Sequence, residues 1–247
     1  MREARAGDVL ITSPQADFDS LRFVATETAC PYLPNRLARN EAFYAERLDG
    51  SLYERLLGRG FRRSGRVVYR PRCRGCAECR SLRVPVGEFA PSRSLRRVWR
   101  KNADLHVTIG PPVATDDKFD LFLRYLETQH DQTMGRTFET FHDFLYDSPT
   151  QTIEFAYHLG RRLVGVSLAD CCPGGLSSVY MYFEPDCAAR SLGTYSVLWE
   201  IDHCRRAGLS YYYLGYHVAG CGKMSYKSHF HPYQILVGDD RWVTFRE

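Results

Sequence analysis

The chain has no hydrophobic run long enough to cross a membrane, and no apolar signal-peptide core near its N-terminus. A membrane-spanning helix needs roughly 18 or more consecutive apolar residues, and a secretory signal joins a basic start to a short apolar segment. Both absences favour a cytoplasmic protein. Internal repeats and low-complexity segments are also missing, which excludes solenoid and repeat-array architectures.

Paired cysteines are also not indicated. The chain has nine cysteines, an odd number that does not suit a fully paired disulfide framework. With 247 residues, of which 44% are hydrophobic, it can bury a core without covalent staples. We therefore expect reduced thiols, with one metal site at most.

The net charge of +4 hides a strong local excess of positive charge. Residues 55–101 contain fifteen Arg or Lys and two acids, a local charge of +13, whereas the remainder contains eighteen basic and twenty-seven acidic residues. A solvated arginine-rich surface is one explanation. The excess is larger than solubility requires, and it favours a polyanionic partner, nucleic acid first.

The most informative stretch of the chain is a strand–helix–strand pattern over residues 176–214. β-Branched and aromatic residues over 176–183 predict a strand, and apolar residues at helical spacing predict a helix that ends at Ala207-Gly208. A second strand follows at 211–214. The free N–H groups at the start of the helix favour an anion. We therefore expect a phosphate-bearing donor near Ser191, Gly193 and Thr194.

Before this pattern, the basic part of the chain contains three predicted elements. Residues 30–39 are expected to enter a helix that presents Arg36 and Arg39 on one face. Ser51 and Glu54 have the spacing of a capping box for a short helix. Residues 61–69 are expected to form a hairpin that turns at Ser64-Gly65.

Three cysteines follow the hairpin in a Cys73-x-x-Cys76-x-x-Cys79 arrangement, just before a predicted strand at 81–86. This spacing places three thiolates around one ion, and Cys30 is a candidate fourth ligand for zinc or an iron–sulfur cluster. Three reduced thiols that tighten a loop are the alternative. A metal here is expected to order the basic segment, and no cofactor is required for the reaction considered below.

Residues 92–102 form a basic stretch around a tryptophan. Leu95, Val98 and Trp99 have the spacing of a buried helix face, and Trp99 could instead stack on an exposed base. Both arrangements leave the cations pointing outward. The residues expected to contact phosphates are Arg93, Arg96, Arg97, Arg100 and Lys101.

Gly110-Pro-Pro is the one plausible domain boundary. We expect a basic, cysteine-containing domain at 1–110 and a second domain at 111–247, in which helices near 119–130 and 138–146 precede a β-meander. Near the C-terminus, Lys223 and Lys227 lie four residues apart with Tyr226 beside Lys227. A solvated lysine pair is possible, but a helix would present the two cations together, as a phosphate or carboxylate ligand requires.

Several of these residues belong to motifs that together resemble one family, over about residues 20–242. The motifs are Cys30-Pro-Tyr-Leu-Pro with Arg36 and Arg39; Tyr69-Arg-Pro with Cys76 and Cys79; Pro91-Ser-Arg-Ser with Arg97; Ser177-Ser-Val-Tyr180; Ser191-Leu-Gly-Thr-Tyr195; and Lys223-Met-Ser-Tyr226-Lys227 with Phe230 and Pro232. They resemble the aminoacyl-tRNA–protein transferases, and among these the bacterial aspartate/glutamate leucyltransferases. The chain has Leu33 where the arginyl enzymes of eukaryotes have a second cysteine.

The resemblance implies a mixed α+β fold with a GNAT-like acyltransferase domain, built on a mostly antiparallel sheet, after a smaller basic N-terminal domain. It implies transfer of leucine from leucyl-tRNA to the N-terminal Asp or Glu of a protein, which marks that protein for N-end-rule degradation. The expected partners are leucyl-tRNA and such acceptor proteins, with no membrane, ATP or coenzyme A.

The chemistry of that reaction assigns candidate residues. The ester donor is already activated, so the enzyme must position the amine, stabilise the oxyanion and protonate the ribose oxygen. Tyr180 and Tyr182 are candidate hydrogen-bond donors at the carbonyl, and Lys223, Tyr226 and Lys227 complete the predicted catalytic set. The acceptor carboxylate needs a cation, for which the candidates are Arg36, Arg39 and Arg83, with Lys223 and Lys227.

Three other functions remain open at this stage. Arginine as the donated residue would keep the family and change the subfamily. An acetyl-CoA-dependent N-acetyltransferase would share the fold, but the bulky Tyr195 after Arg190-Ser-Leu-Gly193-Thr does not suit a coenzyme A pyrophosphate loop. An RNA-binding module without catalysis would leave the 177–195 and 223–230 motifs unexplained.

Overall fold

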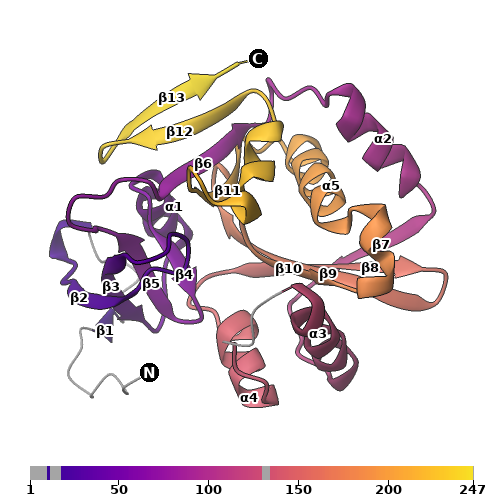
Figure 1. The fold of residues 1–247 in the computed structure, drawn as a ribbon, viewed down its shortest axis with the longest axis horizontal. Helices are drawn as coiled ribbons and strands as arrows, with labels where there is room; N and C mark the ends of the chain where they lie inside the picture. Colours follow the sequence, from indigo (N-terminus) through magenta and orange to yellow (C-terminus); the bar gives the residue numbers. More distant parts are fainter. Residues whose placement is uncertain (1–9, 12–17, 130–133, 247) are drawn as a thin grey trace.

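The computed structural model describes residues 10–11, 18–129 and 134–246, which form two β-sheets with helices packed against them (Figure 1). The larger sheet has eight strands in the order β13-β12-β6-β11-β10-β9-β8-β7. Its strands are β6 (Arg80–Pro85), β7 (Leu105–Gly110), β8 (Thr152–Leu159), β9 (Arg162–Cys172), β10 (Gly175–Phe183), β11 (Tyr211–His217), β12 (Tyr233–Val237) and β13 (Arg241–Phe245). No helix among the described residues has the length and apolarity needed to cross a membrane.

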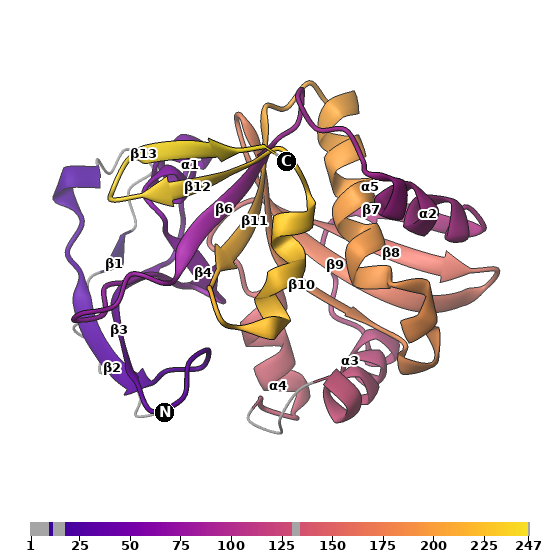
Figure 2. The same cartoon turned by 45° about the horizontal axis from the view of Figure 1, so that its top comes forward.

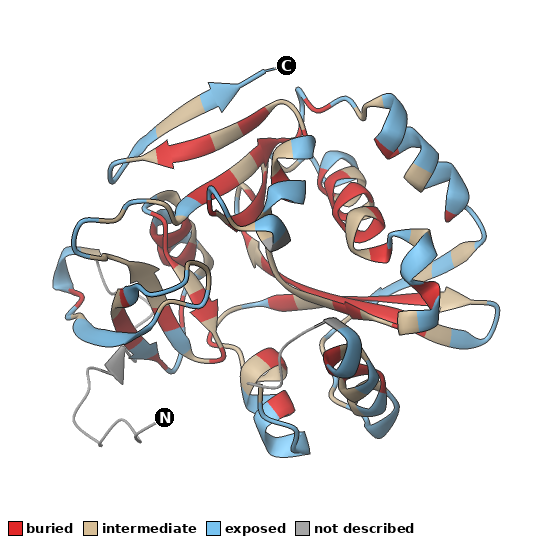
Figure 3. Ribbon diagram, viewed as in Figure 1, coloured by how far each residue is buried: buried red, intermediate tan, exposed pale blue. Residues whose placement is uncertain are grey.

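Helices cover both faces of this sheet. In Figure 1, α5 (Leu192–Arg206) and α2 (Arg93–Lys101) lie on one face, and α3 (Asp116–Gln129) and α4 (Phe138–Phe141) lie on the other. The π-helix η2 (His142–Tyr146) continues α4, while the 3₁₀ helices η3 (Pro185–Arg190) and η4 (Gly222–His229) precede α5 and follow β11. Separate apolar cores fill the two faces, and the buried residues follow the sheet and the inner sides of α5 and α3 (Figure 3).

The smaller sheet is formed by the N-terminal residues. Its strands are β1 (Leu10–Ile11), β2 (Val24–Ala29), β3 (Leu37–Ala45), β4 (Arg62–Ser64) and β5 (Val67–Pro71), in the order β1-β3-β5-β4 with β2 also on β3. Helix α1 (Gly50–Gly58) and the 3₁₀ helix η1 (Phe18–Ser20) accompany this sheet. A third core, which contains Leu52, Leu56 and Phe61, joins α1 to it.

One pair of strands in the eight-stranded sheet is parallel and separates early. β10 pairs with β11 only from Gly175↔Tyr211 to Ser177↔Tyr213, and all other neighbours in this sheet are antiparallel. The register of β10 against β9 shifts between Ser178 and Tyr180. We call the region where β10 and β11 no longer pair, residues 178–183 and 214–217, the divergence. A mostly antiparallel sheet with one diverging parallel pair is the GNAT-like architecture that the resemblance implied.

The local predictions for 61–69 and 176–214 are confirmed. The hairpin is β4–β5, and the strand–helix–strand unit is β10, α5 and β11. The capping prediction for α1 was wrong: the Asp49 side chain accepts the Leu52 N–H, and Glu54 instead accepts the Gly174 N–H at 3.0 Å. An N-cap residue must precede the helix with extended backbone, and here that residue is Asp49.

The predicted helix at 30–39 was also wrong. Residues 31–35 form bends and turns, and β3 begins at Leu37 and pairs with β2 and β5. Pro31 and Pro34 each lack a backbone N–H donor, so a helix there would lose hydrogen bonds. The hydrogen bonds of β3 to β2 and β5 stabilise this segment as a strand instead. Arg36 and Arg39 therefore do not share a helix face.

The sheets do not divide at residue 110, where the domain boundary was predicted. β6 and β7 precede that residue, yet both belong to the eight-stranded sheet. β6 lies between β12 and β11, so the basic segment contributes a central strand to the larger sheet. The division between the two sheets falls between β5 and β6.

Candidate active site

Two cations from distant parts of the chain meet at the divergence. Arg62 of β4 donates from Nη1 to Ser177 Oγ at 2.7 Å and from Nη2 to the Ser178 carbonyl of β10. Lys227 of η4 donates from Nζ to the Tyr216 carbonyl of β11 at 2.8 Å. Figure 2 shows η4 beside β11, and the divergence is therefore bounded by a cation from each half of the chain.

Gly215 of β11 makes this approach possible. Its φ of +89° is a conformation that other residues rarely adopt. A Cβ atom there would lie 3.3 Å from Lys227 Nζ and 3.6 Å from Arg62 Nη2. The two cations therefore converge on one point, and the absence of a side chain at Gly215 leaves that point accessible to both.

The described residues supply no acidic counter-charge to the cation pair. Within the described parts of the chain, neither Arg62 nor Lys227 forms an ion pair with an acidic side chain. Lys227 is only 8% exposed, and burial, together with repulsion from Arg62, lowers the pKa of its ammonium to about 7. Buried charge without a partner is costly. The geometry thus suits an anionic ligand that supplies the missing negative charge.

Tyrosines and the segment after Cys30 surround the cations. Arg62 acts electrostatically on the hydroxyls of Tyr32, Tyr69 and Tyr216, which places it among three phenol groups. Burial raises the pKa of Tyr32 and Tyr69, so both stay neutral hydrogen-bonding groups. The surroundings of Arg62 therefore include neutral phenol groups, of which that of Tyr216 donates to the Gly60 carbonyl at 2.8 Å.

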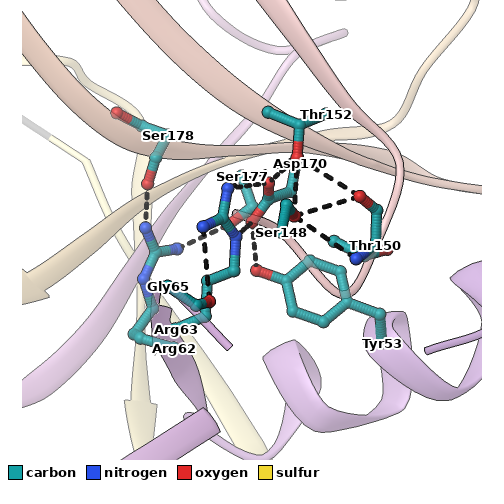
Figure 4. A network of polar contacts seen from close by, with 10 residues as sticks. All are labelled: Tyr53, Arg62, Arg63, Gly65, Ser148, Thr150, Thr152, Asp170, Ser177 and Ser178. Atoms are coloured by element: carbon teal, nitrogen blue, oxygen red, sulfur yellow. Dashed lines mark hydrogen bonds and ion pairs between the residues drawn. The ribbon is translucent and has the colours of Figure 1, made fainter. Parts of the chain in front are cut away.

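Arg62 is positioned by a buried network around its neighbour Arg63, drawn in Figure 4. Arg63 holds Asp170 with two hydrogen bonds of 2.7 and 2.8 Å, and Tyr53 and Thr152 each donate to the same carboxylate at 2.7 Å. Because side chains alternate along a strand, Arg62 points the other way, to β10. Asp170 of β9 is the cross-strand partner of Ser177, so both arginines are anchored on the same strand pair.

The two predicted catalytic tyrosines of β10 have different surroundings. Tyr180 is half-buried among Phe122, Tyr125 and Phe144, and its hydroxyl lies 3.7 Å from Met134 Sδ. Tyr182 is fully buried, and its hydroxyl lies 2.8 Å from that of Tyr146. The structure therefore places Tyr182 in the core between the sheet and α3.

The predicted site residues near the C-terminus are partly brought together. Lys227 belongs to the cation pair, and Tyr226, 37% exposed, packs edge-on against Phe230. The backbone of Lys223 lies in η4, and its side chain lies outside the described part of the structure. The segment is a 3₁₀ helix, in which residues three apart rather than four apart share a face, and of the three predicted residues only Lys227 can be placed in the site.

The three predicted acceptor arginines do not join the cation pair. Arg36 is exposed and donates to Cys76 Sγ at 3.4 Å, while Arg39 faces Glu27 at 4.0 Å. Arg83 lies over the rings of Tyr211 and Trp242, at 3.7 and 4.1 Å, and donates to Gln234 at 2.7 Å. Arg83 thus has cation–π and hydrogen-bond partners that hold β6 to its neighbours.

The four cysteines of the predicted metal site lie near one another. The thiols of Cys30, Cys73 and Cys76 all act electrostatically on Cys79, whose pKa is raised to about 12, chiefly by burial. Backbone N–H groups of Leu33 and Arg39 point at the sulfurs of Cys30 and Cys73, at 3.4 and 3.3 Å. As placed, however, no group of three or more His, Cys, Asp or Glu among the described residues is close enough to hold a metal ion. A metal at these cysteines stays a prediction.

A second basic region lies at the other end of β10. Helix α2 is capped by Ser92 and exposes the side chains of Arg93, Arg96, Arg97, Arg100 and Lys101. Its end is tied to the segment before α5, because Asn102 Nδ2 donates to the Arg190 carbonyl at 2.9 Å. The predicted phosphate-binding residues Ser191, Gly193 and Thr194 begin α5 at this point, with Ser191 at φ 56°. The basic helix α2 and the N-terminal end of α5, which favours anions, thus lie side by side although about ninety residues separate them in the sequence.

Trp99 does not form the buried face of α2. It remains 37% exposed, packs on Tyr195 with ring centroids 5.7 Å apart, and lines a cavity of about 270 Å³ between α2 and α5. Arg96 and Arg100 line the same cavity. Because its ring is exposed beside two arginines, Trp99 is able to stack on a base. This is the second of the two roles that the sequence suggested for it.

Sequence reasoning missed Arg62, Ser178 and Glu200. No sequence motif marks Arg62 as a functional residue. Its side chain reaches β10 only because β4 packs beside that strand in the folded protein. Glu200 was not among the residues predicted to act in the site, and it is 1% exposed. Its spacing from Val197 and Cys204, three and four residues, puts it on the buried stripe, and that spacing could have revealed it.

The sheet with one diverging parallel pair, covered by helices on both faces, has a GNAT-like architecture. Two family models, described as arginine-tRNA-protein transferase N terminus and C terminus, match residues 28–97 and 117–237. The chain belongs to the arginine-tRNA-protein transferase family and is an aminoacyltransferase, whose family name implies a tRNA and a protein as substrates.

Relatives cover nearly the whole chain. An aspartate/glutamate leucyltransferase of Nitrosococcus oceani is 40% identical over 229 residues, which are 91% of this chain and 96% of the relative. One of Pseudomonas syringae pv. tomato is 39% identical over 230 residues, 91% of this chain and 97% of the relative. Among solved structures, FemX aligns with 88% of this chain and 86% of its own at 9% identity and a TM-score of 0.49.

Proposed function

We propose that this enzyme transfers leucine from leucyl-tRNA to the N-terminal Asp or Glu of acceptor proteins, and so marks them for N-end-rule degradation. The observation that carries the proposal is the cation pair Arg62–Lys227 at the divergence. It has no acidic partner among the described residues, and an acceptor side-chain carboxylate supplies one. The relatives named aspartate/glutamate leucyltransferase support the same acceptors.

The donor fits between the two basic regions. Phosphates of the tRNA 3′ end would contact α2 and the start of α5, where cations and free helix N–H groups lie together. From Phe183 back to Ser178, β10 extends about 17 Å. The terminal nucleotides can run along this strand and present the aminoacyl ester at the divergence, next to the acceptor held by Arg62 and Lys227.

The surroundings of Tyr180 favour leucine over arginine as the donated residue. Phe122, Tyr125, Phe144 and Met134 form an aromatic and thioether environment at the position where β10 bulges. A guanidinium group there would need a carboxylate or several acceptors, whereas an isobutyl side chain needs only apolar contact. Leucine is therefore the side chain that this environment suits.

Coenzyme A is not expected as a donor. Arg190, which begins the segment that would cradle a pyrophosphate, is held by Asp104 through two hydrogen bonds of 2.8 and 2.9 Å. Tyr195 is buried beneath Trp99. Neither side chain is available to bind the pyrophosphate of coenzyme A, which disfavours acetyl-CoA as the donor.

A transfer assay with purified enzyme and radiolabelled aminoacyl-tRNA tests the proposal. Leucyl-tRNA and arginyl-tRNA would be compared as donors, and peptides that begin with Asp, Glu, Asn or Ala as acceptors. We expect leucine on the Asp and Glu peptides alone. Arginine on these peptides would overturn the choice of donor, and transfer to Asn at the rate for Asp would overturn the role given to the cation pair.

A second prediction concerns α2. Replacing Arg97 and Arg100 by alanine is expected to weaken tRNA binding and to lower the slope of log affinity against log salt by about one for each phosphate that an arginine neutralises. The measurement is a salt titration of leucyl-tRNA binding, and Arg241→Ala, which removes an exposed arginine of β13, is the control. An unchanged slope in the double variant would show that α2 does not contact the tRNA backbone.

A further inference from the structure

A carboxyl group lies buried on the α5 side of β10. Glu200 of α5 is 1% exposed, and it accepts hydrogen bonds from Ser167 Oγ of β9 at 2.6 Å and from Tyr212 Oη of β11 at 2.7 Å. No cation among the described residues forms an ion pair with it. A leucine would fill this position in a helix core at lower cost. The cost of burying this carboxyl group therefore suggests that it has a function.

The same carboxyl group is connected to the divergence by hydroxyl groups. Leu176 of β10 pairs with Tyr212 of β11, so Ser178, two residues further along β10, lies on the same face of the sheet as Tyr212. Burial raises the pKa of Tyr212, and Ser178 acts in the opposite direction, while Tyr212 donates a hydrogen bond to Glu200. Ser178 is the first residue of β10 beyond its pairing with β11, and it is half-buried whereas Tyr212 and Glu200 are fully buried. The hydroxyls of Ser178 and Tyr212 thus lie between the open end of the divergence and the carboxylate.

We propose that Ser178, Tyr212 and Glu200 form a proton relay for aminoacyl transfer, in which Glu200 holds the proton released by the acceptor amine. This inference rests on the proposed function, because it needs the ester and the amine at the divergence. Ser178 touches the amine, and Tyr212 and Glu200 act through it as positioning and proton-holding residues.

The steps balance in atoms and protons. The neutral α-amine attacks the ester carbonyl carbon and forms the C–N bond, and its nitrogen passes a proton to Ser178 Oγ. Ser178 passes its own proton to Tyr212, and Tyr212 passes its proton to Glu200. When the bond from the carbonyl carbon to the ribose oxygen breaks, a proton returns along the same hydroxyls to that oxygen. Amide and free ribose hydroxyl result, and Glu200 is again a carboxylate.

The protonation of Glu200 suits this exchange. Burial raises the pKa of Glu200 to about 7, although hydrogen bonds from Ser167, Tyr212 and Tyr157 act in the opposite direction. The other titratable groups that act on or are acted on by it are Cys204 of α5 and Tyr226 of η4, both neutral at this pH. Since an α-amine has a pKa of about 8, the proton can move in either direction with little bias.

The test compares single variants of the relay in the leucine transfer assay. Tyr212→Phe and Ser178→Ala are each expected to lower kcat by about 10- to 100-fold, a loss within the range of general-base contributions. The double variant should be no slower than the slower single variant, because removing a second link of one relay removes nothing further. Tyr146→Phe is the control: it removes a hydroxyl that hydrogen-bonds Tyr182 and Glu154 on the α3 side of the sheet, away from Glu200, and we expect kcat within about threefold of wild type.

The pH profile separates a relay from a merely structural network. Because Glu200 must be ionised to accept the proton, kcat should fall as the pH decreases through about 7 in the wild type, and Glu200→Gln should lose this inflection. Wild-type kcat in Tyr212→Phe, or independent losses that multiply in the double variant, would overturn the relay. If Tyr212→Phe fails to fold, Ser178→Ala decides, since Ser178 is only half-buried. A wild-type enzyme without leucine transfer would overturn the proposed function itself.

Discussion

Replacing Arg62 by methionine is expected to lower kcat/KM for transfer to peptides with N-terminal Asp by about 10²- to 10³-fold. Truncating one member of a buried, hydrogen-bonded charge pair costs 2–5 kcal/mol, and each 1.4 kcal/mol corresponds to a factor of ten. Arg62 would form such a pair with the acceptor carboxylate at the divergence. Lys227→Met should lose a similar amount, because its ammonium converges on the same point.

The measurement that distinguishes recognition from scaffold damage is the preference for Asp over Asn acceptors, two side chains of nearly equal shape. Wild type should prefer Asp strongly, and Arg62→Met should reduce that preference toward one. Arg241→Met, the control, removes an exposed arginine at the edge of the sheet and should leave both values unchanged. A variant at Arg62 that is slow but still prefers Asp as wild type does would contradict carboxylate recognition.

The same assignment has a pH dependence with a definite sign. Burial and Arg62 lower the pKa of Lys227 to about 7, so the free enzyme loses the ammonium charge as the pH rises through this value. KM for Asp and Glu peptides should therefore increase above pH 7, whereas the fall of kcat attributed to Glu200 lies on the acidic side. Lys227→Arg, which stays charged throughout, should keep KM constant if it folds as wild type does.

The strand–helix–strand unit of the larger sheet could be predicted because its signals are local. The β-branched and aromatic run at 176–183, the apolar spacing of α5 and the glycine at its end each restrict the backbone within a few residues. The hairpin β4–β5 is predictable for the same reason. By contrast, β6 belongs between β11 and β12, more than 120 residues away in the sequence. Such pairing depends on contacts that no short pattern encodes.

The site shows the same division between local and distant information. Lys227 could be singled out from its short motif, whereas its partner Arg62 is selected by the packing of β4, a three-residue strand of the smaller sheet, against β10. Tyr180 and Tyr182 were chosen for their position on the predicted strand, but after the register shift beyond Ser178 both pack on the α3 side of the sheet, where Tyr182 lies in the core. Strand alternation predicts the facing of side chains only while the register is unbroken.

The buried ion pair beside Arg62 should dominate the stability of the junction between the two sheets. Asp170→Asn is expected to lower the free energy of unfolding by about 3–5 kcal/mol, since it leaves the guanidinium of Arg63 uncompensated in the interior. The side chains of Arg63 and Asp170 are 1% and 0% exposed, and the pair joins β4 of the small sheet to β9 of the large one (Figure 4). Urea denaturation of wild type and variant, with unchanged m-values, measures the loss.

A matched control lies at the same junction. Arg66 and Asp147 form an equally short ion pair of 2.7 Å, but their side chains are 28% and 31% exposed. Water screens this pair, so Asp147→Asn should cost about 1 kcal/mol or less. If Asp170→Asn costs no more than Asp147→Asn, the buried pair does not hold the sheets together. A loss several times larger for Asp170→Asn would support the role of the buried pair. Arg62→Met should be as stable as wild type, because Arg62 lies at the open divergence whereas Arg63 is buried. Lower stability when the Arg63–Asp170 pair is broken, and lower preference for Asp acceptors when Arg62 is replaced, would then show that Arg63 holds the fold and that Arg62 recognises the acceptor.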